Sequence, residues 1–271
     1  MTERAVEHGV LCLPEGRPRA AALVLSGSSG RVEASRARVL AEHGVAALAV
    51  RWFGDEGQPP TPTEVPVESI AEHVTTLREY ADRIIVLGTS YGAAAAMLVG
   101  IADPRVDLVV AIAPTTVVWA TPDQHDDGTP VHRSQFTWHG DPLHFVPYVD
   151  QTAWRGPDFT TTRQLHEASL RSHPGLVGRA RIVVEDISAD LLLVAGGDDR
   201  VWPSAVAAQE IRERRTGSGA GTRLLIHPRA GHRVLLPDED IPPPPRMAHG
   251  GTPEADRELG AQVLEAIVDW L

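Results

Sequence analysis

The sequence predicts an α/β fold in which helices cover both faces of a mostly parallel central sheet. Three observations predict it: short apolar runs rich in branched residues recur, amphipathic or alanine-rich stretches separate them, and glycine or proline marks several joints. Strands that alternate with helices form parallel sheets whose faces are buried beneath those helices. We therefore expect one α/β domain over residues 1–271.

The expected elements follow one another in a regular order. Strands are expected at residues 21–25, 45–50, 84–87, 106–112, 191–195 and 223–226. Helices are expected at residues 33–43, 65–81, 93–101, 204–215 and 252–271. Gly44 is a stop signal for the first helix, whereas Thr252 and Pro253 start the last one, because threonine caps a helix and proline suits its first turn.

A long stretch at about residues 114–180 interrupts this order. It is rich in Trp, His, Pro and Thr and lacks clear periodicity. Because it connects two expected sheet strands, it should lie over the strand ends, and long loops in compact domains usually carry function. We expect an inserted cap over a substrate pocket; a plain surface excursion is the alternative.

The composition limits the classes of partner. The formal net charge is −11, and an acidic surface repels nucleic acid phosphates and anionic membranes. Cys12 is the one cysteine, which excludes an internal disulfide and fits a reducing cytoplasm. The first residues lead into no long apolar run, so we expect no signal peptide, and no window approaches the about 20 apolar residues of a membrane span. We expect a cytoplasmic protein that binds neither nucleic acid nor membrane.

Residues 88–92 read Gly-Thr-Ser-Tyr-Gly, a G-x-S-x-G motif. The serine of such a motif lies on a sharp strand-to-helix turn that exposes its hydroxyl above a sheet. The context fits, because an apolar strand is expected directly before the motif and a helix directly after it. Ser90 is therefore the candidate nucleophile; a glycine-rich turn with a passive serine is the alternative.

Two further residues are expected to activate this serine. A serine hydroxyl needs an imidazole base, and the imidazole needs a carboxylate that fixes its tautomer. In proteins with this serine motif, the acid and then the histidine follow the serine along the sequence. The expected strand at residues 191–195 runs into Gly-Gly-Asp-Asp, which makes Asp199 the preferred acid and Asp198 the alternative. Ala-Gly-His follows the last expected strand, which makes His232 the base.

Two backbone N–H groups are expected to bind the oxyanion of the transition state. One is that of Tyr91, directly after the nucleophile, and the second is that of Ser28, or else Ser29, in the small loop after the first core strand. This chemistry requires no cofactor. No metal is expected either, because the spacing of the histidines in the cap matches no standard zinc pattern: His125, His132, His139 and His144.

Several motifs outside the serine turn are shared with a known family. They lie at residues 65–68, 138–143, 197–204, 230–232 and 250–253. Together with the turn at Ser90 they make residues 20–271 resemble the catalytic domain of the acyl-coenzyme A thioesterase and bile acid-coenzyme A:amino acid N-acyltransferase family. This family is a branch of the α/β-hydrolase superfamily close to the dienelactone hydrolases.

The resemblance implies the α/β-hydrolase fold and acyl transfer from a thioester to water or an amine through an acyl-enzyme. It implies nucleophile, acid and base at Ser90, Asp199 and His232. Members that make amides typically carry cysteine as nucleophile, so a serine favours hydrolysis. Many members also carry an N-terminal β-sandwich domain; only about twenty residues precede the first core strand here, so we expect none.

The expected activity is hydrolysis of a small-molecule acyl thioester, with the acyl group on coenzyme A or on an acyl carrier protein. The alternatives are an acyltransferase or a carboxylester or lactone hydrolase that uses the same triad, and a non-catalytic binding module. Aromatic residues of the cap are expected either to line the acyl pocket or to pack the cap onto the sheet: Trp119, Phe136, Trp138, Phe145 and Tyr148.

Overall fold

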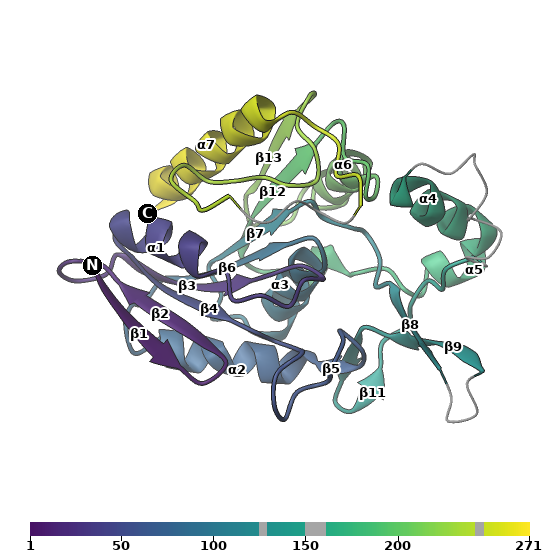
Figure 1. Cartoon of the computed structure of the whole chain (residues 1–271), viewed down its shortest axis with the longest axis horizontal. Helices are drawn as coiled ribbons and strands as arrows, with labels where there is room; N and C mark the ends of the chain where they lie inside the picture. Colours follow the sequence, from purple (N-terminus) through teal and green to yellow (C-terminus); the bar gives the residue numbers. More distant parts are fainter. Residues whose placement is uncertain (125–128, 150–160, 242–246) are drawn as a thin grey trace.

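An eight-stranded sheet forms the centre of the computed structural model, which describes residues 1–124, 129–149, 161–241 and 247–271 (Figure 1). The strand order is β1-β2-β4-β3-β6-β7-β12-β13. From β4 to β13 neighbouring strands pair in parallel, whereas β1 and β2 add an antiparallel hairpin at one edge. The prediction of a mostly parallel sheet is confirmed.

The strands of the sheet are short, and the central ones are apolar. Their bounds are β1 (Thr2–Val6), β2 (Gly9–Leu13), β3 (Ala20–Leu25), β4 (Val45–Val50), β6 (Ile84–Thr89), β7 (Leu108–Ile112), β12 (Asp190–Gly196) and β13 (Thr222–His227). Every residue of β3, β4 and β7 is buried, because helices cover both faces of this part of the sheet. The hairpin of β1 and β2 was not predicted, since β1 is polar and exposed along its whole length.

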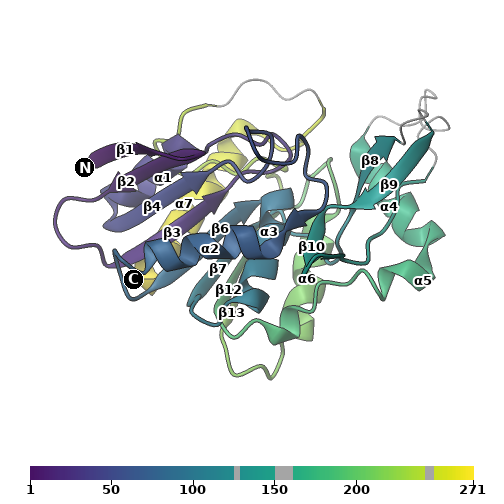
Figure 2. The ribbon, with the colours of Figure 1, turned by 90° about the horizontal axis from the view of Figure 1, so that it is seen from below.

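Helices cover the two faces of the sheet in two groups (Figure 2). On one face lie α1 (Ala34–Glu42) and α7 (Pro253–Trp270); on the other lie α2 (Val67–Leu77), α3 (Tyr91–Ala102) and α6 (Ser204–Arg214). Side chains alternate between these two cores along each strand, so Leu23 of β3 packs on the α2/α3 side and Val24 on the α1/α7 side. In the described part of the chain no helix is long and apolar enough to cross a membrane.

The stretch at residues 114–180, named here the cap segment, contains more regular structure than its sequence pattern indicates. It forms an antiparallel hairpin of β8 (Ala120–Gln124) and β9 (Pro130–Ser134), then β10 (Phe136–Trp138), β11 (Asp141–Pro142), α4 (Thr162–Ser172) and α5 (Pro174–Val177). The strand β10 pairs with β5 (Val65–Pro66), just before α2. The cap segment projects beyond the sheet in both views (Figures 1 and 2).

Candidate active site

Ser90 lies at the turn between β6 and α3, where the sequence predicts the nucleophile. Its backbone has φ 60° and ψ −119°, a region that is unfavourable for a residue with a side chain. The backbone N–H of Ser90 donates to the Ile112 carbonyl, 2.8 Å away, on the neighbouring strand. The flanking glycines are sterically required, because a Cβ on Gly88 would lie 1.9 Å from the Gly92 oxygen and one on Gly92 would lie 2.5 Å from the Ser26 oxygen.

The loop after β3 passes directly beside Ser90. A Cβ placed on Gly27 would lie 3.0 Å from Ser90 Cβ and 3.6 Å from Ser90 Oγ, so this loop runs beside the candidate nucleophile with no room for a side chain at position 27. Ser28 is the next residue of the loop. Together with Ser29, Arg51 and Phe53 it lines a surface cavity of about 350 Å³. Tyr91 is the first residue of α3, and the N–H groups of a first helical turn have no partner inside the helix.

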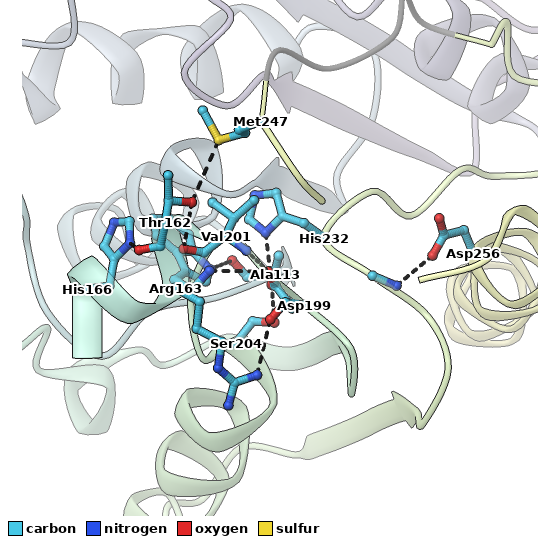
Figure 3. A network of polar contacts seen from close by, with 12 residues as sticks. Ala113, Thr162, Arg163, His166, Asp199, Val201, Ser204, His232, Met247 and Asp256 are labelled. Atoms are coloured by element: carbon cyan, nitrogen blue, oxygen red, sulfur yellow. Dashed lines mark hydrogen bonds and ion pairs between the residues drawn. The ribbon is translucent and has the colours of Figure 1, made fainter. Parts of the chain in front are cut away.

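Asp199 and His232 meet at the ends of β12 and β13. The Nδ1–H of His232 donates to Oδ2 of Asp199 over 2.8 Å (Figure 3). Both residues are buried, Asp199 completely. A neutral imidazole that donates from Nδ1 presents Nε2 as a proton acceptor, which is the tautomer that a general base requires.

The carboxylate of Asp199 is fully satisfied in this buried position. Its Oδ1 accepts from the N–H groups of Val201 at 2.8 Å and Trp202 at 3.2 Å, and its Oδ2 also accepts from the Ser204 hydroxyl. Burial alone would raise the pKa of Asp199, but the nearby His232 and these hydrogen bonds outweigh burial and lower that pKa. The group is therefore a carboxylate at neutral pH.

Asp198, the alternative acid, has a different role in the turn. Its side chain accepts from the Gly251 N–H at 2.9 Å and from Arg200 Nε at 3.1 Å. Both bonds lower the pKa of Asp198, with the Gly251 bond as the larger cause. Asp198 thus ties the turn to the chain before α7, and Asp199 is the aspartate that binds His232.

The first turn of α4 binds the loop that carries Asp199 (Figure 3). Arg163 donates from its backbone N–H to the Arg200 carbonyl at 3.0 Å and from Nη1 to the Asp199 carbonyl at 3.1 Å. The hydroxyl of Thr162 donates to the Val201 carbonyl at 3.1 Å. The cap segment therefore holds three consecutive carbonyl groups around the candidate acid.

The aromatic residues of the cap segment divide into two groups. Trp119 is 1% exposed and stacks on Tyr148 at a centroid distance of 5.6 Å, and Phe136 is 0% exposed and stacks on Trp52 at 5.7 Å. Trp119, Phe136 and Tyr148 are thus buried in packing contacts, and their part in an acyl pocket stays a prediction. The other two candidates, Trp138 and Phe145, are half-buried and pack against the core.

Two residues near His232 were missed as site residues in the sequence. The Trp202 ring lies between those of Tyr91 and His232, with centroids 5.6 and 5.5 Å away, and the Ser204 hydroxyl binds Asp199. Both residues belong to the shared motif at residues 197–204, and that motif was the sequence signal that could have identified them as site residues. Tyr148 also reaches the serine turn, because its hydroxyl lies 3.0 Å from that of Tyr91.

The histidines of the cap segment form no metal site among the described residues, where no group of three or more His, Cys, Asp or Glu could hold an ion. His125 lies outside the described residues. His132 packs its ring against Tyr148, and His139 packs against Trp138.

His166 of α4 is buried beside the site, and it predicts a pH-dependent stability. Burial lowers the pKa of His166 from 6.5 to about 4, and its Nδ1 bonds the Thr162 carbonyl at 2.8 Å. Between pH 6.5 and pH 4 the unfolded chain binds a proton here that the folded chain does not. The free energy of unfolding should therefore fall on acidification through this window, by about 3 kcal/mol from this residue.

Urea unfolding at pH 7 and pH 5 tests this expectation. His166→Gln should show a smaller loss of stability between the two pH values than the unmodified protein. His139→Gln is the matched control, because that side chain is 76% exposed and its removal should leave the loss unchanged. An unchanged loss in His166→Gln would contradict the assignment; His249, whose pKa burial also lowers to about 4, would then be the main source.

Comparisons with known proteins identify the family of the chain. A family profile described as "BAAT / Acyl-CoA thioester hydrolase C terminal" matches residues 68–242, more than half of the chain. Acyl-coenzyme A amino acid N-acyltransferase 2 of Mus musculus is 29% identical over 239 residues, which cover 85% of this chain and 53% of that protein. Acyl-coenzyme A amino acid N-acyltransferase 1 of the same species is 27% identical over 239 residues, with coverages of 85% and 52%. The chain spans about half the length of the curated relatives it matches.

Solved structures with the same fold include esterases. A Klebsiella pneumoniae protein assigned as a dienelactone hydrolase has a TM-score of 0.56 at 14% identity, covering 97% of this chain and 92% of its own. The esterase domain of a Rhodothermus marinus protein has a TM-score of 0.54 at 16% identity, with coverages of 96% and 90%. At these identities the similarity establishes the fold. By its fold and its profile match, the chain is an α/β hydrolase and belongs to the BAAT / acyl-CoA thioester hydrolase C-terminal family of enzymes.

Proposed function

We propose that this protein is a serine hydrolase of acyl thioesters, with Ser90 as nucleophile, His232 as base and Asp199 as acid. The observation that carries the proposal is the bond from His232 Nδ1 to a buried, ionised Asp199. These two residues follow β12 and β13, which run parallel to β6 and therefore end at the same edge of the sheet as the strained turn at Ser90. A hydrolase of this type needs all three features in one site.

The proposed reaction has two halves. The Ser90 oxygen attacks the thioester carbonyl carbon while His232 Nε2 takes the hydroxyl proton, and the tetrahedral intermediate then expels the thiolate, which receives that proton. A water molecule next attacks the acyl-enzyme, gives its proton to His232 and releases the carboxylic acid as the proton returns to Ser90. Asp199 stabilises the imidazolium in both halves.

The proposed oxyanion donors are the N–H groups of Tyr91 and Ser28. Tyr91 begins α3, where backbone N–H groups are unpaired and the helix dipole favours negative charge. The loop runs so close to Ser90 at Gly27 that a Cβ there would lie 3.0 Å from Ser90 Cβ, which supports a donor from the next residue in that loop. Removal of one such donor typically costs about 10²- to 10³-fold in kcat.

The family supports a thioester substrate, and acyl transfer to an amino acid is the second candidate. The two mouse relatives are named as acyl-coenzyme A amino acid N-acyltransferases, which favours coenzyme A as the carrier and an amine as a possible acceptor. Serine at position 90 favours water as the acceptor, because amide-forming members typically carry cysteine. Carrier-protein thioesters and oxoesters remain further substrates to compare.

Active-site labelling tests the proposal. A fluorophosphonate probe should add one phosphonyl group to the protein, and mass spectrometry of the peptides should locate it on Ser90. An acyl-coenzyme A substrate should slow labelling. Products formed in the presence of glycine distinguish the candidates, since hydrolysis gives the free acid and transfer gives an N-acyl amino acid. Labelling elsewhere, or none, would count against the serine mechanism.

A further inference from the structure

Arg36 is a buried arginine whose guanidinium group joins three separate segments of the chain. It lies on α1, and its side chain is 6% exposed. It binds both carboxylate oxygens of Glu239: Nε donates to Oε1, and Nη2 donates to Oε2 over 3.0 Å. The Glu239 side chain is 4% exposed, so this is an interior ion pair with a fork geometry.

The ion pair organises the loop that follows His232. Arg36 Nη2 donates to the Val234 carbonyl at 2.9 Å, and Glu239 Oε2 accepts from the Leu236 N–H at 2.9 Å. Val234 is two residues after His232. Because this loop has no strand or helix from which to obtain hydrogen bonds, a charged pair that satisfies its backbone groups fixes its path.

The same guanidinium group reaches the serine turn. Its Nη1 donates to the Thr89 hydroxyl at 2.7 Å, and Thr89 directly precedes Ser90. The strained conformation of Ser90 persists only if its surroundings enforce it. One side chain therefore contacts the residue before the candidate nucleophile and the loop of the candidate base.

We infer that Arg36 and Glu239 are positioning residues that hold the Ser90 turn and the His232 loop in one fixed relation. The inference rests on the proposed triad, because it assigns the pair to the alignment of Ser90 with His232. Stability alone does not explain a buried ion pair, since apolar residues of similar volume in the same place often give a fold that is equally stable. A displacement of a reacting group by about 1 Å can cost about 10²-fold in rate, so alignment is a sufficient reason to retain the pair.

A second buried arginine supplies a matched control at the opposite ends of the strands. Arg215 is 2% exposed and donates to the carbonyls of Val184, Ile187 and Ala189 and to the hydroxyl of Thr222 at the start of β13. It resembles Arg36 in burial and in having a threonine partner. It contacts neither the Ser90 turn nor the His232 loop.

The test compares Arg36→Lys with Arg215→Lys, and Thr89→Val with Thr222→Val. For each variant, Tm is measured first, and then kcat and KM on a p-nitrophenyl ester and on an acyl-coenzyme A. The rate of fluorophosphonate labelling is also measured, and kcat and the labelling rate are expressed per folded molecule. We expect Arg36→Lys to lower kcat and the labelling rate by about 10- to 100-fold with KM little changed. Thr89→Val should lower both in the same direction, and the two control variants should lower Tm without changing kcat.

The pH profile adds a readout that a purely structural role would not move. Misalignment of His232 with Ser90 should displace the acidic limb of kcat/KM in Arg36→Lys and leave it unchanged in Arg215→Lys. Equal kcat losses in the two lysine variants, or wild-type kcat in Arg36→Lys, would overturn the inference. Failure of the triad itself is distinguishable, because turnover would then survive in Ser90→Ala whatever the arginine variants do.

Discussion

Ser90→Ala is expected to remove turnover almost completely, with a loss of about 10⁶-fold in kcat. The alanine side chain cannot form the acyl-enzyme, so only the oxyanion donors and substrate binding would continue to lower the barrier. The backbone conformation at this position, φ 60°, is no easier for serine than for alanine, so the fold should be retained. Substrate affinity should change little.

Ester hydrolysis and fluorophosphonate labelling together measure this loss. Ser188→Ala is the matched control, because Ser188 is an exposed serine on the same chain and should leave both activities intact. Full labelling of the Ser90→Ala protein would identify a different nucleophile. Retained turnover without labelling would indicate a mechanism in which water attacks the substrate directly.

Asp199→Asn is expected to lower kcat by about 10⁴-fold, the second largest effect. Asparagine keeps the shape of the side chain but presents an NH₂ group in place of one oxygen. With its oxygen kept toward the N–H groups of Val201 and Trp202, the amide nitrogen faces His232 Nδ1. His232 must then accept at Nδ1 and carry its proton on Nε2, which removes the base.

The neighbouring carboxylate gives the matched control for this substitution. Asp198→Asn removes one charge from the same turn, and its oxygen can still accept from the Gly251 N–H. We expect wild-type kcat within about twofold, since the residue has no contact with His232. Equal losses in the two asparagine variants, measured by steady-state kinetics, would show that charge in this loop matters more than the His232 bond.

Much of the fold could be predicted from the sequence, because six strands of the sheet are apolar runs with helical stretches between them. The hairpin of β1 and β2 could not be predicted, because every residue of β1 is exposed and the sequence of β1 therefore shows no alternation of apolar and polar residues. The β8–β9 hairpin was missed for a related reason. Its strands contain prolines and polar residues, and cross-strand pairing rather than local propensity determines them.

The candidate site could be predicted where a motif fixes residue types at a short spacing. The serine turn, the Asp-Asp pair and the Ala-Gly-His segment are of this kind. Arg36 and Glu239 gave no such signal, because arginine and glutamate on helices and loops are usually exposed, and their bond spans 203 positions of the chain. Only the three-dimensional arrangement shows that their charges are buried together.

The contact between α4 and the loop that carries Asp199 limits which changes of the cap segment the candidate site would tolerate. Arg163 and Thr162 donate to the carbonyl groups of Asp199, Arg200 and Val201, so direct hydrogen bonds link the cap segment to the candidate active site. A deletion in the cap segment that removed α4 would also remove these hydrogen bonds from the loop of Asp199, the residue that binds His232. Under the proposed function, a change of acyl specificity is therefore better sought in substitutions of single side chains, such as the predicted pocket residues Trp138 and Phe145, than in a shorter cap segment.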